Sequence, residues 1–117
     1  MRIHHLALRT RNVERLRVFY THIVGLVEVR DRSGGVWLDA DGTVVMIEEA
    51  IESEPLPSPT SMELIAFAIE PEEKSQLLER LDANSCEVES RTDYTLYVRD
   101  PDGRRIAFSH YPTMPTL

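Results

Sequence analysis

The chain has 117 residues, of which 28% are charged and 42% hydrophobic, and its formal net charge is −7. This composition is typical of a globular domain, which excludes a disordered chain, and the length fits one domain with its own core. No apolar run approaches about 18 residues and no signal-peptide pattern opens the sequence, so we expect a cytoplasmic protein without membrane contact. The single cysteine, Cys86, excludes an internal disulfide and a thiolate metal cage.

Charge is distributed unevenly along the chain. Residues 1–32 hold seven basic and three acidic side chains, whereas residues 33–73 hold ten acidic side chains and no Lys or Arg. The acidic segment repels phosphates and the basic part contains no recognised nucleic-acid module, so no nucleic-acid partner is expected. The carboxylates either keep the protein soluble or line a cleft for a cationic ligand. A solvated basic face near the first helix is the interpretation of Arg9, Arg11, Arg15 and Arg17.

Residues 1–50 predict a strand, a helix and three further strands. The alternating segment 2–9 is the first strand. Asn12 is a good N-cap for a helix that Gly25 ends. Three short strands follow, separated by glycine-containing turns, at 26–31, 35–40 and 43–49.

The same order recurs after a proline-rich linker, residues 51–61. Residues 62–69 predict a strand, and Pro71 begins a helix that carries three leucines at helical spacing. Three more strands are predicted, at 86–91, 94–100 and 104–110. The whole chain, 1–117, is therefore expected to be a single domain built from module one (1–50) and module two (62–112).

The two modules also match in detail. HLAL at 5–8 aligns with LIAF at 64–67, an offset of 59 residues, and DADG at 39–42 aligns with DPDG at 100–103, an offset of 61. Such self-similarity indicates an internal duplication. Because one sheet with one helix leaves a face uncovered, pairing two such modules is a physically sensible way to build a core. The predicted fold class is α+β, with two tandem βαβββ modules forming a cupped, curved mixed sheet.

In this order, the motifs resemble the vicinal oxygen chelate superfamily, which includes glyoxalases, bleomycin resistance proteins and extradiol dioxygenases. The matching motifs are HLAL at 5–8, FY at 19–20 with VGL at 24–26, WL at 37–38 with DG at 41–42, and DPDG at 100–103. The resemblance covers nearly the whole chain and implies the glyoxalase-like fold. In the family's metal enzymes, side chains of the first and last strand of each module hold an ion that the substrate chelates.

Carried over by motif, the four ligand positions are His5, Met46, Leu64 and Ala107; the family often has Glu where Ala107 stands. Strand alternation places these side chains on the cavity face. Thioether, isobutyl and methyl groups do not hold a hard or borderline divalent ion in water. We therefore expect no cofactor, and the alternative is a divalent metal ion held weakly by His5 with Glu48.

Three apolar positions turn the cavity into a pocket suited to a small organic molecule. The predicted cavity residues are His5, Trp37, Met46, Glu48, Leu64, Tyr97, Arg105 and Ala107. Trp37 and Tyr97 either offer stacking surface or pack in the core or a dimer interface. Arg105 on the same face needs a carboxylate partner, from the protein or from an anionic ligand, so the charge of the ligand stays open.

The favoured hypothesis is a metal-free protein that binds a small organic molecule, for sequestration or sensing. The alternative is a metal-dependent lyase, isomerase or dioxygenase of the same superfamily that uses His5 with Glu48; no catalytic residue is assigned. A homodimer is expected as well, because small members of this fold commonly share sheet edges or exchange modules.

Overall fold

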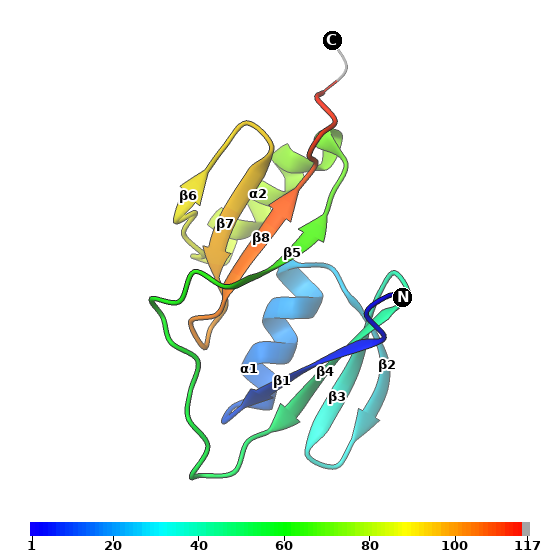
Figure 1. Ribbon diagram of the computed structural model, residues 1–117, viewed down its shortest axis with the longest axis vertical. Helices are drawn as coiled ribbons and strands as arrows, with labels where there is room; N and C mark the ends of the chain where they lie inside the picture. The colour runs from blue at the N-terminus through cyan, green and yellow to red at the C-terminus, as the bar shows by residue number, and fades with distance from the viewer. Residues whose placement is uncertain (116–117) are drawn as a thin grey trace. The chain divides into compact units, whose positions relative to one another are not determined.

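The computed structural model describes residues 1–115. The chain divides into two compact units, Met1–Leu56 and Pro57–Leu117, and the boundary lies inside the proline-rich segment. Each unit is one βαβββ module, blue to green and then green to red in Figure 1. The fold is therefore α+β, with the two expected modules. No helix in the described part of the chain is both long and apolar enough to cross a membrane.

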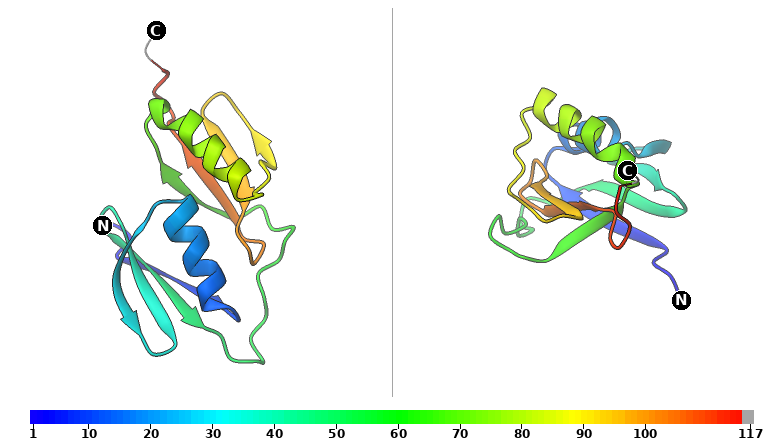
Figure 2. Two further views of the ribbon diagram at one scale, coloured as in Figure 1. Left: turned by 180° about the vertical axis from the view of Figure 1, so that it is seen from behind. Right: turned by 90° about the horizontal axis from the view of Figure 1, so that it is seen from above.

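The first unit is a four-stranded mixed sheet with a helix on one face (Figure 2). Its elements are β1 (His5–Thr10), α1 (Val13–Val18), the π-helical turn η1 (Phe19–Ile23), β2 (Val27–Arg32), β3 (Gly35–Ala40) and β4 (Thr43–Glu49). The strand order is β1-β4-β3-β2, and β1 lies parallel to β4 while the other pairs are antiparallel.

Alternation of side chains along the strands creates the core of this unit. The face beneath α1 carries apolar residues that are at most 6% exposed, among them Leu8, Leu38 and Ile47, packed with Leu16 and Tyr20. The other face, which we call the open face of the first sheet, carries the intervening side chains. These are His5, Ala7 and Arg9 of β1, Val44, Met46 and Glu48 of β4, and Gly35, Trp37 and Asp39 of β3.

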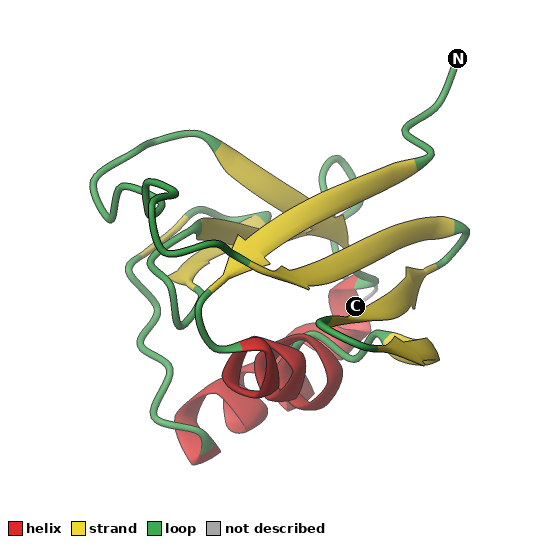
Figure 3. Cartoon of the chain, turned by 90° about the horizontal axis from the view of Figure 1, so that it is seen from below, coloured by secondary structure: helices red, strands yellow, loops and turns green. Residues whose placement is uncertain are grey.

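The second unit repeats this plan. Its elements are β5 (Leu64–Ala68), the 3₁₀ turn η2 (Pro71–Glu73), α2 (Lys74–Ala83), β6 (Ser90–Arg91), β7 (Thr95–Arg99) and β8 (Arg105–Ser109). The strand order is β5-β8-β7-β6, and in each unit the helix lies on one side of its own sheet (Figure 3). Leu77 and Leu81 of α2 are buried with Leu96, Ile106 and Phe108. The open face of the second sheet carries Leu64, Ala66, Tyr97, Arg99, Arg105 and Ala107.

The helix signals are confirmed. The backbone N–H of Arg15 donates to Oδ1 of Asn12 at 3.0 Å, so Asn12 caps α1. Gly25, at φ +91°, ends the helical segment. The backbone N–H of Leu26 donates to the carbonyl of Tyr20 at 2.9 Å across that turn. The one unpredicted feature is that the last turn, η1, is π-helical.

Two predicted strands are shorter than expected. The strand predicted over 62–69 is confined to Leu64–Ala68, and of 86–91 only Ser90–Arg91 pairs with β7. One further bond extends this edge, from the backbone N–H of Glu89 to the carbonyl of Tyr97 at 2.8 Å. The alternation at 86–91 suits a strand, but it does not specify how far a partner strand runs alongside.

Candidate functional site

The strand register makes the duplicated positions equivalent in space as well as in sequence. His5 lies opposite Val44, and Leu64 lies opposite Arg105. Met46 is flanked by Ala7 and Trp37, and Ala107 is flanked in the same way by Ala66 and Tyr97. The offsets of 59 and 61 residues are therefore kept across the parallel strand pairs, so Met46 matches Ala107 and Trp37 matches Tyr97.

The four positions implied by the superfamily's metal enzymes do not fit a metal ion. His5 is exposed, and its Nδ1 lies 3.0 Å from Nδ1 of His4. Leu64 is 40% exposed and Ala107 is fully buried, and neither of them nor Met46 offers a hard donor atom. Among the described residues, no three His, Cys, Asp or Glu side chains lie close enough together to hold an ion.

His5 and Glu48 share the open face of the first sheet but stand at opposite ends of it. His5 pairs with Val44, and Glu48 follows four residues later on β4. Four strand residues span about 13 Å. Two ligand atoms of one zinc-like ion lie within about 4 Å of each other. His5 and Glu48 therefore cannot share an ion within this sheet, and Glu48 instead pairs with Arg9 at 3.5 Å.

A pocket of about 730 Å³ opens on this face at the end of β4. Three of the predicted cavity residues, Trp37, Met46 and Glu48, line it, and His5 does not. The remaining lining comes from Arg9, from the β2–β3 turn and from the segment after β4: Arg32, Ser33, Gly34, Gly35, Glu49, Ala50, Ile51 and Glu52. The pocket therefore combines an aromatic and a thioether surface with several charges.

Trp37 is held between two arginines and a methionine. The guanidinium carbons of Arg30 and Arg32 lie 5.3 Å and 4.6 Å from the centre of the indole ring, within the range of cation–π attraction. Met46 lies directly opposite on β4. Trp37 thus forms a partly exposed, orientationally fixed platform in the pocket wall.

Arg9 and Arg11 hold the segment after β4 in place, a role that sequence reasoning missed. Arg9 donates from Nε and Nη2 to the carboxylate of Glu54, which also accepts from the backbone N–H of Ile51 at 3.0 Å. Nη2 of Arg11 donates to the backbone carbonyls of Glu52 and Glu54 at 2.8 and 3.0 Å. The interpretation of these two arginines as a solvated face is wrong, because they bind the acidic segment.

The same contacts perturb a carboxyl group. Hydrogen bonding from Arg9, and then from the backbone of Ile51, lowers the pKa of Glu54 from 4.5 to about 2. The partner effect raises the pKa of Arg9 above its ordinary value. The pocket wall therefore stays ionised across the physiological range. The signal available in the sequence was the position of Arg9 on the first strand, at the end where the acidic run begins.

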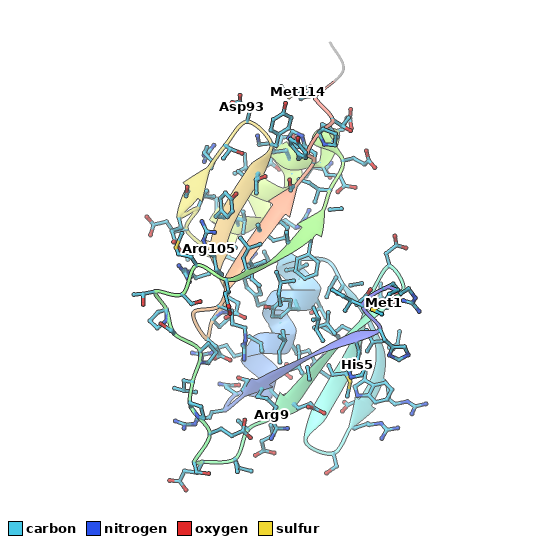
Figure 4. All side chains as sticks on the ribbon, in the orientation of Figure 1. Met1, His5, Arg9, Asp93, Arg105 and Met114 are labelled. Atoms are coloured by element: carbon cyan, nitrogen blue, oxygen red, sulfur yellow. The ribbon has the colours of Figure 1, made fainter. Side chains whose placement is uncertain are left out.

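Four other predicted residues lie on the second sheet. The guanidinium carbon of Arg105 is 4.1 Å from the centre of the Tyr97 ring, and Figure 4 shows Arg105 on the open face of its sheet. Leu64 and Arg105 line a second pocket of about 380 Å³, while Ala107 has no exposed surface. The predicted cavity residues are thus found on the open faces of two sheets, in two separately described units.

Comparisons with known proteins agree with this architecture. Similar solved structures include a glyoxalase/dioxygenase from Nostoc punctiforme, with 25% identity, a TM-score of 0.77, and 92% of this chain and 88% of that chain covered. A lactoylglutathione lyase from Agrobacterium tumefaciens has 20% identity and a TM-score of 0.71, with 92% of both chains covered. A mutant of the fosfomycin resistance protein FosX from Listeria monocytogenes, complexed with Mn(II) and 1S,2S-dihydroxypropylphosphonic acid, has 19% identity and a TM-score of 0.76, with 92% and 88% covered.

No curated protein gives a significant match. The model of the Glyoxalase/Bleomycin resistance protein/Dioxygenase superfamily matches residues 2–108, which spans both modules. That match agrees with the HLAL and DPDG motifs, with the two βαβββ units and with their common register. The chain therefore belongs to the glyoxalase/bleomycin resistance protein/dioxygenase superfamily.

Proposed function

We propose that this chain binds a small organic molecule on the open face of its first sheet, without a resident metal ion, for sequestration or sensing. The pocket volume of about 730 Å³ falls in the range of known small-molecule sites, roughly 300–1,000 Å³. Trp37 and Met46 supply apolar contact surface, and Arg9, Arg32 and Glu48 supply a few polar groups around it. This mixture is common in sites that recognise organic ligands.

One observation carries the proposal: the pocket coincides with a position where the superfamily's metal enzymes place a ligand, and Met46 stands there. The thioether and its neighbour Trp37 replace coordination chemistry with contact surface. The metal-dependent alternative would need His5 and Glu48 to act together, and about 13 Å of strand separates them. Binding is therefore favoured over metal-dependent catalysis.

The charges in the lining favour a cationic ligand with an apolar body. Glu48, Glu49 and Glu52 face two guanidinium groups in the same lining, those of Arg9 and Arg32. Arg9 is already neutralised by Glu54 and Glu48. The remaining carboxylates would raise the local concentration of a cation, and its aromatic or alkyl part would lie against the indole of Trp37.

The sole tryptophan of the chain makes the test direct. We expect Trp37 fluorescence to change saturably with benzyltrimethylammonium and less with the neutral benzyl alcohol, in protein freed of metal with a chelator. Glu48→Gln should weaken binding of the cation severalfold, and the matched charge change Glu79→Gln, at an exposed position of α2, should not. If a panel of organic cations changes neither the fluorescence nor the melting temperature, the proposal fails.

We also propose that two copies associate through the edge of the first sheet. β2 is an edge strand whose residues are all exposed, and it presents Val27 and Val29 at 63% and 56% exposure. An unprotected apolar edge is a template for pairing with another strand. Sedimentation equilibrium should give a dimer for the parent and a monomer for Val29→Lys; a parent that is monomeric at every concentration contradicts this.

A further inference from the structure

The guanidinium group of Arg105 is held in a fixed orientation on the open face of the second sheet. It lies flat against Tyr97, with its central carbon 4.1 Å from the ring centre (Figure 4). Arg105 projects from β8, and Tyr97 projects from the neighbouring strand β7 on the same face. Stacking of this kind orients the planar group and leaves its edge free to form paired hydrogen bonds.

Arg105 differs from its neighbours in having no acidic partner. Arg99 donates to both carboxylate oxygens of Glu89, at 2.6 and 3.1 Å, and Arg104 pairs with Asp102 at 3.2 Å. Within residues 1–115, Arg105 forms no ion pair, and its buried Nε has no hydrogen-bond partner. A buried donor on a charged group is costly when it is left unsatisfied. Such a deficit is expected where a ligand completes the hydrogen bonding.

A pocket of about 380 Å³ adjoins this group. Arg105 is half-buried and lines it, so part of its side chain is accessible from the pocket. Ser58 and Ser61 lie in the same lining as hydroxyl groups, and Leu64 provides an apolar wall. Glu63 is the one carboxylate in the lining, and it forms no ion pair with Arg105.

We propose that Arg105 binds the oxyanion of a small molecule, a carboxylate or a phosphate-type group, whose apolar part lies against Leu64. The two oxygens of such a group match the paired donors of a guanidinium edge, and the charge compensates a cation that the chain itself leaves unpaired. Ser58 and Ser61 are further donors for a third oxygen. This second site extends the proposed function, yet it does not depend on the pocket at Trp37.

The test follows the Nε–H signal of Arg105 by ¹H–¹⁵N NMR during separate titrations with sodium phosphate and sodium benzoate at constant ionic strength. We expect a saturable shift of this signal, and of the backbone amide of Leu64, with at least one of the two anions. The stronger of the two distinguishes a phosphate-type group from a carboxylate on an apolar ring. Absence of a saturable shift with both anions overturns the proposal.

Variants separate a specific contact from a general charge effect. Arg105→Gln should weaken binding, followed at the Leu64 amide, by at least about tenfold, because a charge-assisted hydrogen-bond pair is lost. Arg91→Gln removes the same charge from a side chain opposite Leu96, on the other face of the sheet, and should leave binding unchanged. Glu63→Gln should strengthen it. Equal weakening by Arg105→Gln and Arg91→Gln would overturn the proposal.

The two sites have independent readouts. Arg105→Gln should leave the Trp37 fluorescence titration with benzyltrimethylammonium unchanged, because Trp37 belongs to the other sheet. Loss of the Arg105 response with a retained Trp37 response would reject the anion site alone. The opposite result would reject the proposed function and keep the anion site.

Discussion

Glu54 is the residue whose ionisation is most altered by the fold. Its pKa falls from 4.5 to about 2, first because Arg9 donates hydrogen bonds to its carboxylate. A carboxyl group whose folded pKa is lowered stabilises the folded state at every pH above its unfolded pKa. That contribution is lost as the pH falls from about 4.5 toward 2. Acid should therefore release the segment that Glu54 ties to β1.

Glu54→Gln should test this linkage. We expect the variant to be less stable than the parent at neutral pH, and the difference in melting temperature to shrink as the pH falls from 4.5 to 2. Glu52→Gln is the matched control, because only the backbone carbonyl of Glu52 is bound by Arg11. A difference that stays constant over this pH range would contradict the role of Glu54.

Ala107→Glu restores the carboxylate that the superfamily's metal enzymes often carry at this position, and it should not create a metal site. The equivalent and neighbouring positions, Met46 and Leu64, still lack donor atoms for a divalent ion. Arg105, two residues away on the same face, competes for the introduced carboxylate. Thermal shift with Mn(II), Ni(II) and Zn(II) should match the parent. Stoichiometric metal retained by the variant after dialysis would show that the position was assigned wrongly.

At the scale of the elements, the two helical segments end in the same backbone conformation with different residues. After α2, the N–H groups of Cys86 and Ser85 donate to the carbonyls of Leu81 and Asp82 at 2.8 and 3.1 Å, which is a Schellman motif. Ser85 occupies its left-handed position at φ +55°. After η1 the equivalent conformation, φ +91°, is supplied by Gly25. A side chain is disfavoured in this region, so Ser85 carries a strain that Gly25 avoids.

Exchanging the residue types at these ends should therefore have opposite effects. Ser85→Gly should raise the free energy of unfolding by about 0.5 kcal/mol, since relief of strain exceeds the added flexibility of the unfolded chain. Gly25→Ala should lower it by about 1 kcal/mol. No atom lies within 4 Å of the added Cβ at Gly25, so that cost is conformational. Urea unfolding measures both, and a destabilised Ser85→Gly would contradict the first.

The elements also show which local signals suffice. Asn12, Gly25 and the Asp41-Gly42 turn act through their own backbone, so their roles could be predicted from residue type alone. The short β6 could not, because its length depends on how far β7 runs beside it. The π-helical turn η1 likewise depends on how Phe19 and Tyr20 pack into the core. Local chemistry predicts where elements begin and turn, while tertiary pairing decides their extent.

For the whole molecule, the duplication was the most informative pattern. It predicted the family, two modules and the matching of Met46 with Ala107, because repeated motifs at offsets of 59 and 61 residues require repeated register. The candidate site was less predictable. Alternation placed His5 and Glu48 on one face, but only the register shows that they lie at its opposite ends. The stacking of Arg105 on Tyr97 and the bonds from Arg9 to Glu54 join residues far apart in sequence, which no periodicity reports.

Metal removal tests the molecule as a whole. Because the four positions of the duplicated site hold one imidazole and three apolar side chains, neither module depends on an ion for its structure or its pocket. Extensive treatment with EDTA should leave the melting temperature and the Trp37 response to an organic cation unchanged, and adding back Mn(II), Ni(II) or Zn(II) should raise neither. Every core contact described is made by side chains within one module, so stability should follow burial in the two cores. A fall in melting temperature with EDTA that one divalent ion reverses would return the chain to the metal-dependent members of its superfamily.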